Sequence, residues 1–360
     1  MTTLREKIGQ LFMVGIQGEA LSRDERLIVE QCGFGGFILF GRNCREAKQI
    51  LSLCRALWKT GAELPPLIAI DQEGGRVHRL PQPFTHFPSA ALIGRSGDSD
   101  LAYRAGRAAA AELSLLGINL NFAPVLDVDS NPNNPIIGDR SFGRRPDQVI
   151  KFASPYAQGL RHGGIIPCGK HFPGHGDTDK DSHLDLPVVE KALAELKAVE
   201  LPSFVQACRS GIEALLTAHV IYRALDPELP ATLSERIVTG LLHHELGYDG
   251  VVFSDDLEMK AISANYGAEQ AATLALRAGV DALLFCHELI HAVQALEFLC
   301  AEAEKEPALR AKVEESYRRI SQLKNGRLKA FTGAKETEIS ARLASLDHQR
   351  IVDEIQGSSL

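Results

Sequence analysis

The segment IIPCGKHFPGHGDTDKDSH, from Ile165 to His183, decides the fold class of this 360-residue chain. It begins as a short apolar run that ends in Lys170-His171, as a buried strand does when it delivers polar side chains at its tip. The remainder, Phe172–His183, is broken by Pro and Gly and is rich in His and Asp. Burying so many unpaired charges would be costly, so this second part is predicted to be a surface loop that carries a polar site.

Similar short apolar runs recur along the chain. Besides Ile165–His171 they are Leu11–Ile16, Gly36–Phe40, Leu67–Asp71, Asn119–Val125, Ala214–His219, Val251–Asp255 and Ala282–Phe285. Between them lie segments with helical periodicity, for example Asp100–Leu116, Val189–Ser210 and Ala268–Ala278. Strands that alternate with helices predict a parallel sheet, and eight such units predict a closed α/β barrel, the (β/α)8 TIM-type fold, in a single domain.

The domain boundaries follow from the weakening of the apolar pattern near the C-terminus. Residues 1–330 are predicted to form the catalytic barrel, and residues 331–360 a C-terminal extension. Leu343–Ile355 is expected to form a helix packed on the barrel, and Gln356–Leu360 to fray. No Ser/Pro-rich linker divides the chain.

The composition is that of a globular protein, with 45% hydrophobic and 24% charged residues. A net charge of −7 without a basic stripe argues against a nucleic-acid partner. No apolar run near the N-terminus is long enough for a signal peptide or a membrane span. The seven scattered cysteines contain no C-x-x-C pair, so we expect reduced thiols and a cytoplasmic location without a membrane partner.

Several predicted strands end in reactive polar residues, namely Asp71, Lys170-His171, His219 and Asp255. In a barrel of this type the C-terminal ends of the strands form the active-site face. Any one of these residues can also be an ordinary polar cap at a strand end. Four such endings together predict one shared pocket.

Asp255 lies in VVFSDDLEM, residues 251–259, where an apolar strand carries a carboxylate pair to its tip. Because side chains alternate along a strand, only one of Asp255 and Asp256 is expected to point into the barrel mouth. A fixed carboxylate there suits a nucleophile or a general base. The alternative is a helix N-cap, which applies more to Asp256 than to Asp255.

Asp181 and His183 form an Asp-Ser-His unit on the predicted loop. Two residues apart on an extended segment, they can hydrogen-bond, and the aspartate would orient the imidazole and raise its pKa. Such a histidine can protonate a leaving group and later take a proton from water. A surface turn with an accidental Asp–His pair is the alternative.

Two other polar segments are candidates for binding. In DQEGGRVHR, residues 71–79, the glycines allow close approach to a ligand, Asp71 can accept hydrogen bonds from hydroxyls, and Arg79 can reach an amide oxygen or a carboxylate. Arg140 lies in a long polar loop over residues 133–142 and is expected to face the pocket. The alternatives are an internal Asp71–Arg79 pair, and a pair between Arg140 and Asp139 or another acid.

Neither a phosphate loop nor a metal centre is predicted. The glycine-rich Gly33–Gly36 precedes a strand, whereas a phosphate loop joins a strand to a helix. The His and Asp residues between His171 and His183 match no standard zinc or calcium spacing. We therefore expect no metal and no cofactor.

Taken together, these motifs resemble family 3 glycoside hydrolases, and more closely the bacterial β-N-acetylhexosaminidases of the NagZ type. The matching segments occur in the family's order: GQLF at 9–12, DQEGGRV at 71–77, GDRSF at 138–142, KHFPGHG at 170–176, DSH at 181–183, TAHV at 217–220 and FSDDL at 253–257. The resemblance covers nearly the whole predicted barrel.

The resemblance implies roles by position. Asp255 matches the catalytic nucleophile, and His183 matches the acid/base with Asp181 as its dyad partner. The residues that match contacts to N-acetylglucosamine are Asp71, Arg79, Arg140, Lys170 and His171. The implied substrate is the β-1,4 bond between N-acetylglucosamine and 1,6-anhydro-N-acetylmuramic acid in muropeptides, cleaved during peptidoglycan recycling by a monomeric enzyme.

Four other functions remain open. In a phosphorylase, phosphate would replace water in the second step. A β-glucosidase or β-xylosidase would usually carry further domains and a different acid/base. A sugar-binding protein without activity would need to have lost Asp255 or His183, and both are present. A metal hydrolase would lose its activity to a chelator.

Overall fold

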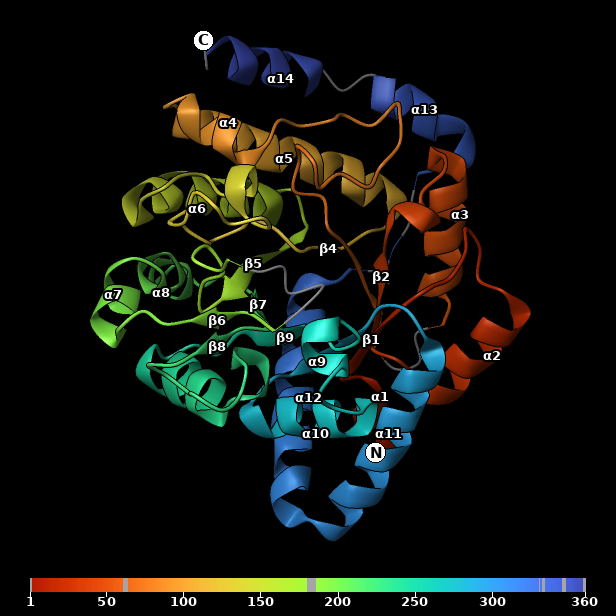
Figure 1. The fold of residues 1–360 in the computed structure, drawn as a ribbon. Helices are drawn as coiled ribbons and strands as arrows, with labels where there is room; N and C mark the ends of the chain where they lie inside the picture. Colours follow the sequence, from red (N-terminus) through yellow and green to blue (C-terminus); the bar gives the residue numbers. More distant parts are fainter. Residues whose placement is uncertain are drawn as a thin grey trace.

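The computed structural model describes residues 2–60, 64–179, 186–329, 331, 334–344 and 348–358. Within these residues, parallel strands close a barrel in the order β1-β10-β9-β7-β5-β4-β3-β2 (Figure 1). Its eight strands are β1 Phe12–Gly15, β2 Gly36–Leu39, β3 Leu67–Ile70, β4 Leu120–Asn121, β5 Ile166–Phe172, β7 Ala214–Thr217, β9 Val251–Asp256 and β10 Ala282–Phe285. The predicted (β/α)8 barrel is confirmed.

Each barrel strand lies at a predicted apolar run. Strands β5 and β9 continue one residue beyond the expected ends, and β4 is much shorter than the run at 119–125. A second, smaller parallel sheet pairs β6 Val188–Val189 with β8 Ile221–Tyr222, and the sequence did not predict it.

The helices surround the barrel (Figure 1). They are α1 Leu4–Gly9, α2 Arg23–Cys32, α3 Ala47–Trp58, α4 Ala90–Arg95, α5 Ser99–Leu116, α6 Pro146–His162, α7 Leu193–Ala198, α8 Leu201–Arg209, α9 Lys260–Ser263, α10 Ala268–Ala278, α11 Leu289–Lys305, α12 Pro307–Arg327, α13 Glu336–Ala344 and α14 His348–Gly357. Short 3-10 turns are η1 Gly41–Asn43, η2 Gly138–Arg140 and η3 Ala231–Leu233, and η4 Arg236–Glu245 is a π-helix. Local sequence explains the ends: Ser22 forms a capping box with Glu25 before α2, and Gly117 ends α5 in the left-handed conformation.

The segment over residues 189–210, where helical periodicity was expected, contains two helices and the end of a strand. Val189 belongs to β6, and two helices, α7 and α8, occupy the rest of the segment. Pro202 lies in the first turn of α8, where its missing N–H costs nothing. Inside one continuous helix the same proline would break the hydrogen-bond ladder, so the helix restarts there.

The C-terminal residues form two helices where one was expected. Helix α13 packs against α3, and α14 packs against α5 and α4 (Figure 1). Helix α14 continues to Gly357, inside the segment that was expected to fray. The division into a barrel of residues 1–330 and an extension of 331–360 stays a prediction.

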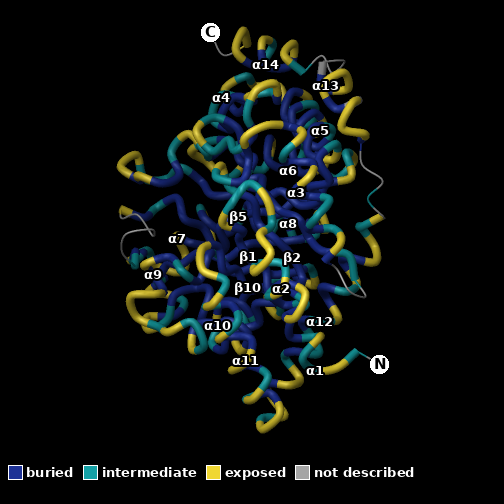
Figure 2. The backbone as a smooth tube through the Cα atoms, turned by 90° about the vertical axis from the view of Figure 1, so that its right-hand side faces the viewer, coloured by how far each residue is buried: buried dark blue, intermediate teal, exposed yellow. Residues whose placement is uncertain are grey.

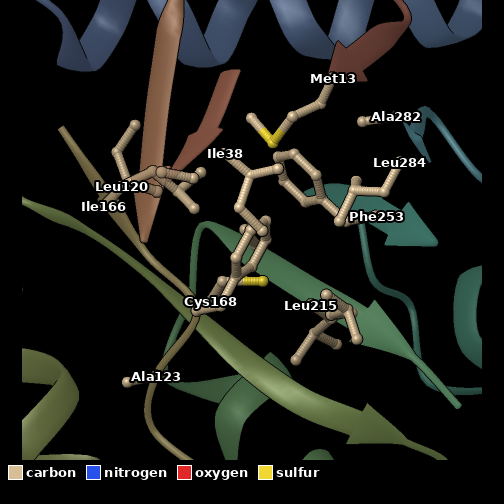
Figure 3. Packing of buried hydrophobic residues seen from close by; sticks show 14 of the residues in the cluster. Met13, Ile38, Leu120, Ala123, Ile166, Cys168, Leu215, Phe253, Ala282 and Leu284 are labelled. Carbon is tan, nitrogen blue, oxygen red and sulfur yellow. The ribbon is translucent and has the colours of Figure 1, made fainter. Parts of the chain in front are cut away.

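The barrel interior is filled with apolar side chains (Figure 3). Met13, Ile38, Cys168 and Phe253 point into it from four different strands, and each is at most 3% exposed. The buried backbone in Figure 2 follows the same strands, with exposed residues concentrated on the outer helices and loops. The barrel is therefore a packed core, which gives any site at its mouth a closed floor.

Among the described residues, no helix is long and apolar enough to cross a membrane.

Candidate active site

A cavity of about 430 Å³ opens at the C-terminal ends of the barrel strands. It is lined by six of the residues that the sequence predicted for the site, namely Asp71, Arg79, Arg140, Lys170, His171 and Asp255. Two hollows elsewhere are larger, about 630 and 750 Å³, but their linings contain none of these six residues. The convergence of polar groups, and not size, therefore selects the candidate site.

Lys170 is the centre of a charge network on the cavity wall. Its Nζ lies 2.6 Å from Asp71 Oδ1 and 2.6 Å from Glu73 Oε1. Burial alone would lower the pKa of this lysine, but Asp71 and Glu73 outweigh that effect and raise it. Lys170 therefore stays a cation although its side chain is only 4% exposed.

Glu73 also binds Arg140 through two parallel hydrogen bonds. Arg140 Nε and Nη2 donate to the two Glu73 carboxylate oxygens at 2.9 and 2.8 Å. Burial would raise the pKa of Glu73, but Arg140 and Lys170 hold it well below its usual value. The alternative that Arg140 pairs with an acid is thus correct, though the acid is Glu73, while Asp139 pairs with Arg76.

The imidazole of His171 pairs with Asp127, a fully buried aspartate that follows β4. Asp127 Oδ2 lies 2.7 Å from His171 Nδ1, and the carboxylate also accepts hydrogen bonds from the backbone N–H groups of His171 and His175. Burial raises the pKa of Asp127 to about 6. Burial, with Arg140 and Lys170 next in effect, lowers the pKa of His171 to about 3, so the imidazole is neutral at pH 7.

Asp255 and Asp256 both border the cavity. The pairing of β9 with β10 shifts register between Ala282 and Leu284, which breaks strict alternation at this strand end. Asp256 Oδ1 accepts hydrogen bonds from the backbone N–H groups of Glu258 and Cys286. The N-cap alternative for Asp256 is wrong, because α9 has Met259 at its cap position.

Arg79 reaches the cavity from the segment after β3. Its backbone N–H donates to Gln72 Oε1 at 2.9 Å. Its buried Nε has no hydrogen-bond partner among the described residues. The alternative of an internal Asp71–Arg79 pair does not hold in the described structure, where Asp71 pairs with Lys170.

The predicted acid/base His183 and its partner Asp181 lie outside the described residues. The residues on both sides of them are held by close packing and ion pairs. A Cβ on Gly176 would lie 1.6 Å from the Val128 carbonyl oxygen, so this position accepts only glycine. Asp177 Oδ1 lies 3.0 Å from Lys191 Nζ, which is also 2.7 Å from Glu200 Oε1, and this ties the two flanks together.

Sequence reasoning missed the structural importance of Glu73, Asp127 and His175. Glu73 lies in the motif DQEGGRVHR, but the sequence suggested no role for it. His175 lines the cavity, and its backbone N–H donates to Asp127. Asp127 follows the fourth strand and lies between the apolar residues Val125-Leu126 and Val128. An acid in such a run needs buried partners, and that was the signal available.

No group of three or more His, Cys, Asp or Glu residues suited to a metal ion occurs in the described part of the chain.

Comparison with known proteins identifies the family. Residues 3–323 match the model described as the glycosyl hydrolase family 3 N terminal domain. The chain belongs to this family. The predicted class, a glycoside hydrolase, is confirmed, and so is the predicted likeness to β-N-acetylhexosaminidases.

Three relatives illustrate the likeness. A β-hexosaminidase of Tolumonas auensis is 39% identical over 302 residues, covering 83% of this chain and 88% of that protein. A family 3 β-N-acetylglucosaminidase from Paenibacillus sp. superposes with a TM-score of 0.88 at 39% identity, over 98% of this chain and 68% of that one. NagZ from Neisseria gonorrhoeae, solved with N-trifluoroacetyl-D-glucosamine, gives a TM-score of 0.78 at 30% identity, over 97% and 98% of the two chains.

Proposed function

We propose that this protein is a retaining exo-β-N-acetylglucosaminidase. The observation that carries the proposal is the position of Asp255, which borders one cavity together with all five residues expected to contact the sugar. That cavity, of about 430 Å³, is of the size that small ligands occupy.

In the proposed complex, Asp71 accepts hydrogen bonds from sugar hydroxyls, while Arg79, Arg140 and Lys170 donate to hydroxyl or amide oxygens. Lys170 and Arg140 keep their charge because the carboxylates of Asp71 and Glu73 pair with them. Such a pre-arranged set of donors loses little freedom when the sugar binds.

The proposed reaction has two steps. Asp255 attacks the anomeric carbon and forms a covalent glycosyl-enzyme of inverted configuration, while His183, oriented by Asp181, protonates the leaving oxygen. His183 then deprotonates water, which displaces Asp255 and restores the original configuration. The usual retaining pair is two carboxylates, and here a histidine takes the place of one of them.

The finer part of the proposal concerns the substrate and its place in the cell. The substrate is a muropeptide in which N-acetylglucosamine is linked to 1,6-anhydro-N-acetylmuramic acid, and the enzyme acts as a cytoplasmic monomer without a cofactor in peptidoglycan recycling. The likeness to NagZ supports this choice.

Hydrolysis of 4-nitrophenyl β-N-acetylglucosaminide, compared with the β-glucoside, tests the proposal. We expect strong preference for the N-acetyl sugar and a loss of several orders of magnitude in Asp255→Ala. Product analysis in phosphate buffer separates hydrolysis from phosphorolysis. Turnover of neither sugar, or an Asp255→Ala variant nearly as active as the wild type, would reject the mechanism.

A further inference from the structure

His171 lies between a buried anion and a buried cation. On one side, its Nδ1 is 2.7 Å from Asp127 Oδ2. On the other, its Nε2 is 3.5 Å from Arg140 Nη2. An arginine nitrogen carries only donors, so the histidine nitrogen that faces it must present a lone pair.

The two contacts therefore select one tautomer. An ionised Asp127 accepts hydrogen bonds and has no proton to give, so Nδ1 must carry the imidazole proton. The same proton on Nε2 would point at Arg140, and an imidazolium would bring a like charge against both Arg140 and Lys170. The low pKa of His171 has this same origin in burial and these two cations.

We propose that Asp127 is a positioning residue that locks His171 in the Nδ1–H tautomer, so that His171 Nε2 accepts a hydrogen bond from Arg140 Nη2 and holds the guanidinium in place at the cavity. This inference rests on the proposed function, in which Arg140 contacts the sugar. It assigns His171 the orientation of Arg140 and removes it from any role as proton donor.

The two oxygens of the Asp127 carboxylate have different partners, which restricts the protonation of the imidazole. Its Oδ1 accepts the backbone N–H of His175 at 2.7 Å, while Oδ2 serves Nδ1 of His171. In Asp127→Asn one of the two positions becomes an NH2 group. A backbone N–H cannot turn into an acceptor, whereas an imidazole nitrogen can. The amide oxygen is therefore expected to face His175, and its NH2 group to face Nδ1, which moves the imidazole proton to Nε2.

The chain offers a matched control in Asp226. This buried carboxylate also accepts two backbone N–H groups, from Glu228 and Leu229, and one side-chain donor, Ser234 Oγ. It is not among the residues that line the active-site cavity. Asp226→Asn thus reproduces the loss of a buried carboxylate without touching His171.

The first test is nitrogen NMR of the full chain labelled in histidine, with His171 assigned by comparison with His171→Gln. We expect a protonated Nδ1 and a bare Nε2 for His171 in the wild type and in Asp226→Asn, and the reverse in Asp127→Asn. A proton on Nε2 in the wild type, or an unchanged tautomer in Asp127→Asn, would overturn the inference. This readout does not depend on turnover, so it stands apart from a failure of the proposed function.

The second test measures kcat and KM for 4-nitrophenyl β-N-acetylglucosaminide. In Asp127→Asn an Nε2–H group would face the Arg140 guanidinium, so kcat/KM should fall by about tenfold or more, while Asp226→Asn should stay within about threefold of the wild type. An Asp127→Asn variant with the reversed tautomer and the same kcat/KM as Asp226→Asn would count against the positioning role.

Discussion

Both ends of the barrel bury a lysine, and the two lysines behave in opposite ways. At the mouth, Lys170 touches two carboxylates, and its pKa is raised. At the other end, Lys324 Nζ lies 2.7 Å from Gln10 Oε1 and 2.7 Å from the Gly35 carbonyl oxygen, both neutral acceptors, and burial lowers its pKa to about 7. The same residue type is thus kept fully charged at neutral pH in one place, while in the other it loses its proton near neutral pH.

The two networks differ in whether their charged groups border a cavity. At the same end as Lys324, the Asp281 carboxylate accepts hydrogen bonds from Val252 N–H at 2.9 Å and from Arg319 at 3.1 Å. These bonds connect the residue before β10 to strand β9 and helix α12. At the mouth, Asp71 and Glu73 pair with Lys170 and Arg140, and both cations border the cavity. Buried charge therefore serves stability at one end and substrate binding at the other.

The largest expected effect of a mouth substitution is on activity. Glu73→Gln removes the charge that pairs Arg140 and Lys170, and should lower kcat/KM for 4-nitrophenyl β-N-acetylglucosaminide by about 100-fold or more. Steady-state kinetics, with circular dichroism to check folding, measure this. Activity within about threefold of the wild type would show that the charge network does not position the substrate contacts.

The corresponding substitution at the other end should act on stability alone. Asp281→Asn leaves Arg319 without its buried anion, and should lower the free energy of unfolding by about 3 kcal/mol. Urea unfolding measures the loss, and kcat/KM should stay near the wild-type value below the unfolding transition. A fall in kcat/KM of the folded variant would contradict the claim that buried charge at this end of the barrel serves stability alone.

The pH dependence of stability sharpens the contrast between the lysines. The folded-state pKa of Lys324, about 7, lies below the ordinary value of 10.5, so the unfolded chain binds more protons between these values and stability rises with pH across that interval. From pH 7 to 9 this rise should amount to about 2 kcal/mol. Lys324→Met should remove that part of the slope, whatever its effect on absolute stability, and equal slopes in the two proteins would contradict the assignment.

The smallest expected effect concerns the flanks of the segment that carries His183. Lys191→Ala breaks the tie to Asp177 and Glu200 and should slow hydrolysis about tenfold for alkyl leaving groups, which need protonation. Dinitrophenyl glycosides leave without a proton and should be nearly unaffected. Arg161→Ala, which breaks a comparable pair with Glu213, is the control. An equal loss for both kinds of leaving group would indicate general damage and reject a link to the acid/base.

Local pattern was enough to predict the barrel and part of its mouth. Apolar runs bounded by turns located the eight barrel strands, because strand burial depends on consecutive side chains. The polar strand ends located Asp71, Lys170, His171 and Asp255, because the ends of parallel strands meet at one face. The residues suggested candidate roles, and the family resemblance reduced these to one role for each residue.

Tertiary structure alone decided how those side chains are held. Glu73 meets Arg140 across 67 positions of chain, and Asp127 meets His171 across 44. Hydrogen bonds and ion pairs of this kind depend on which loops the closed barrel brings together, and no local periodicity encodes that distance. The sequence by itself therefore determined which residues face the mouth, while the packing of the barrel determined which of them are charged, which are neutral and which nitrogen of His171 carries the proton.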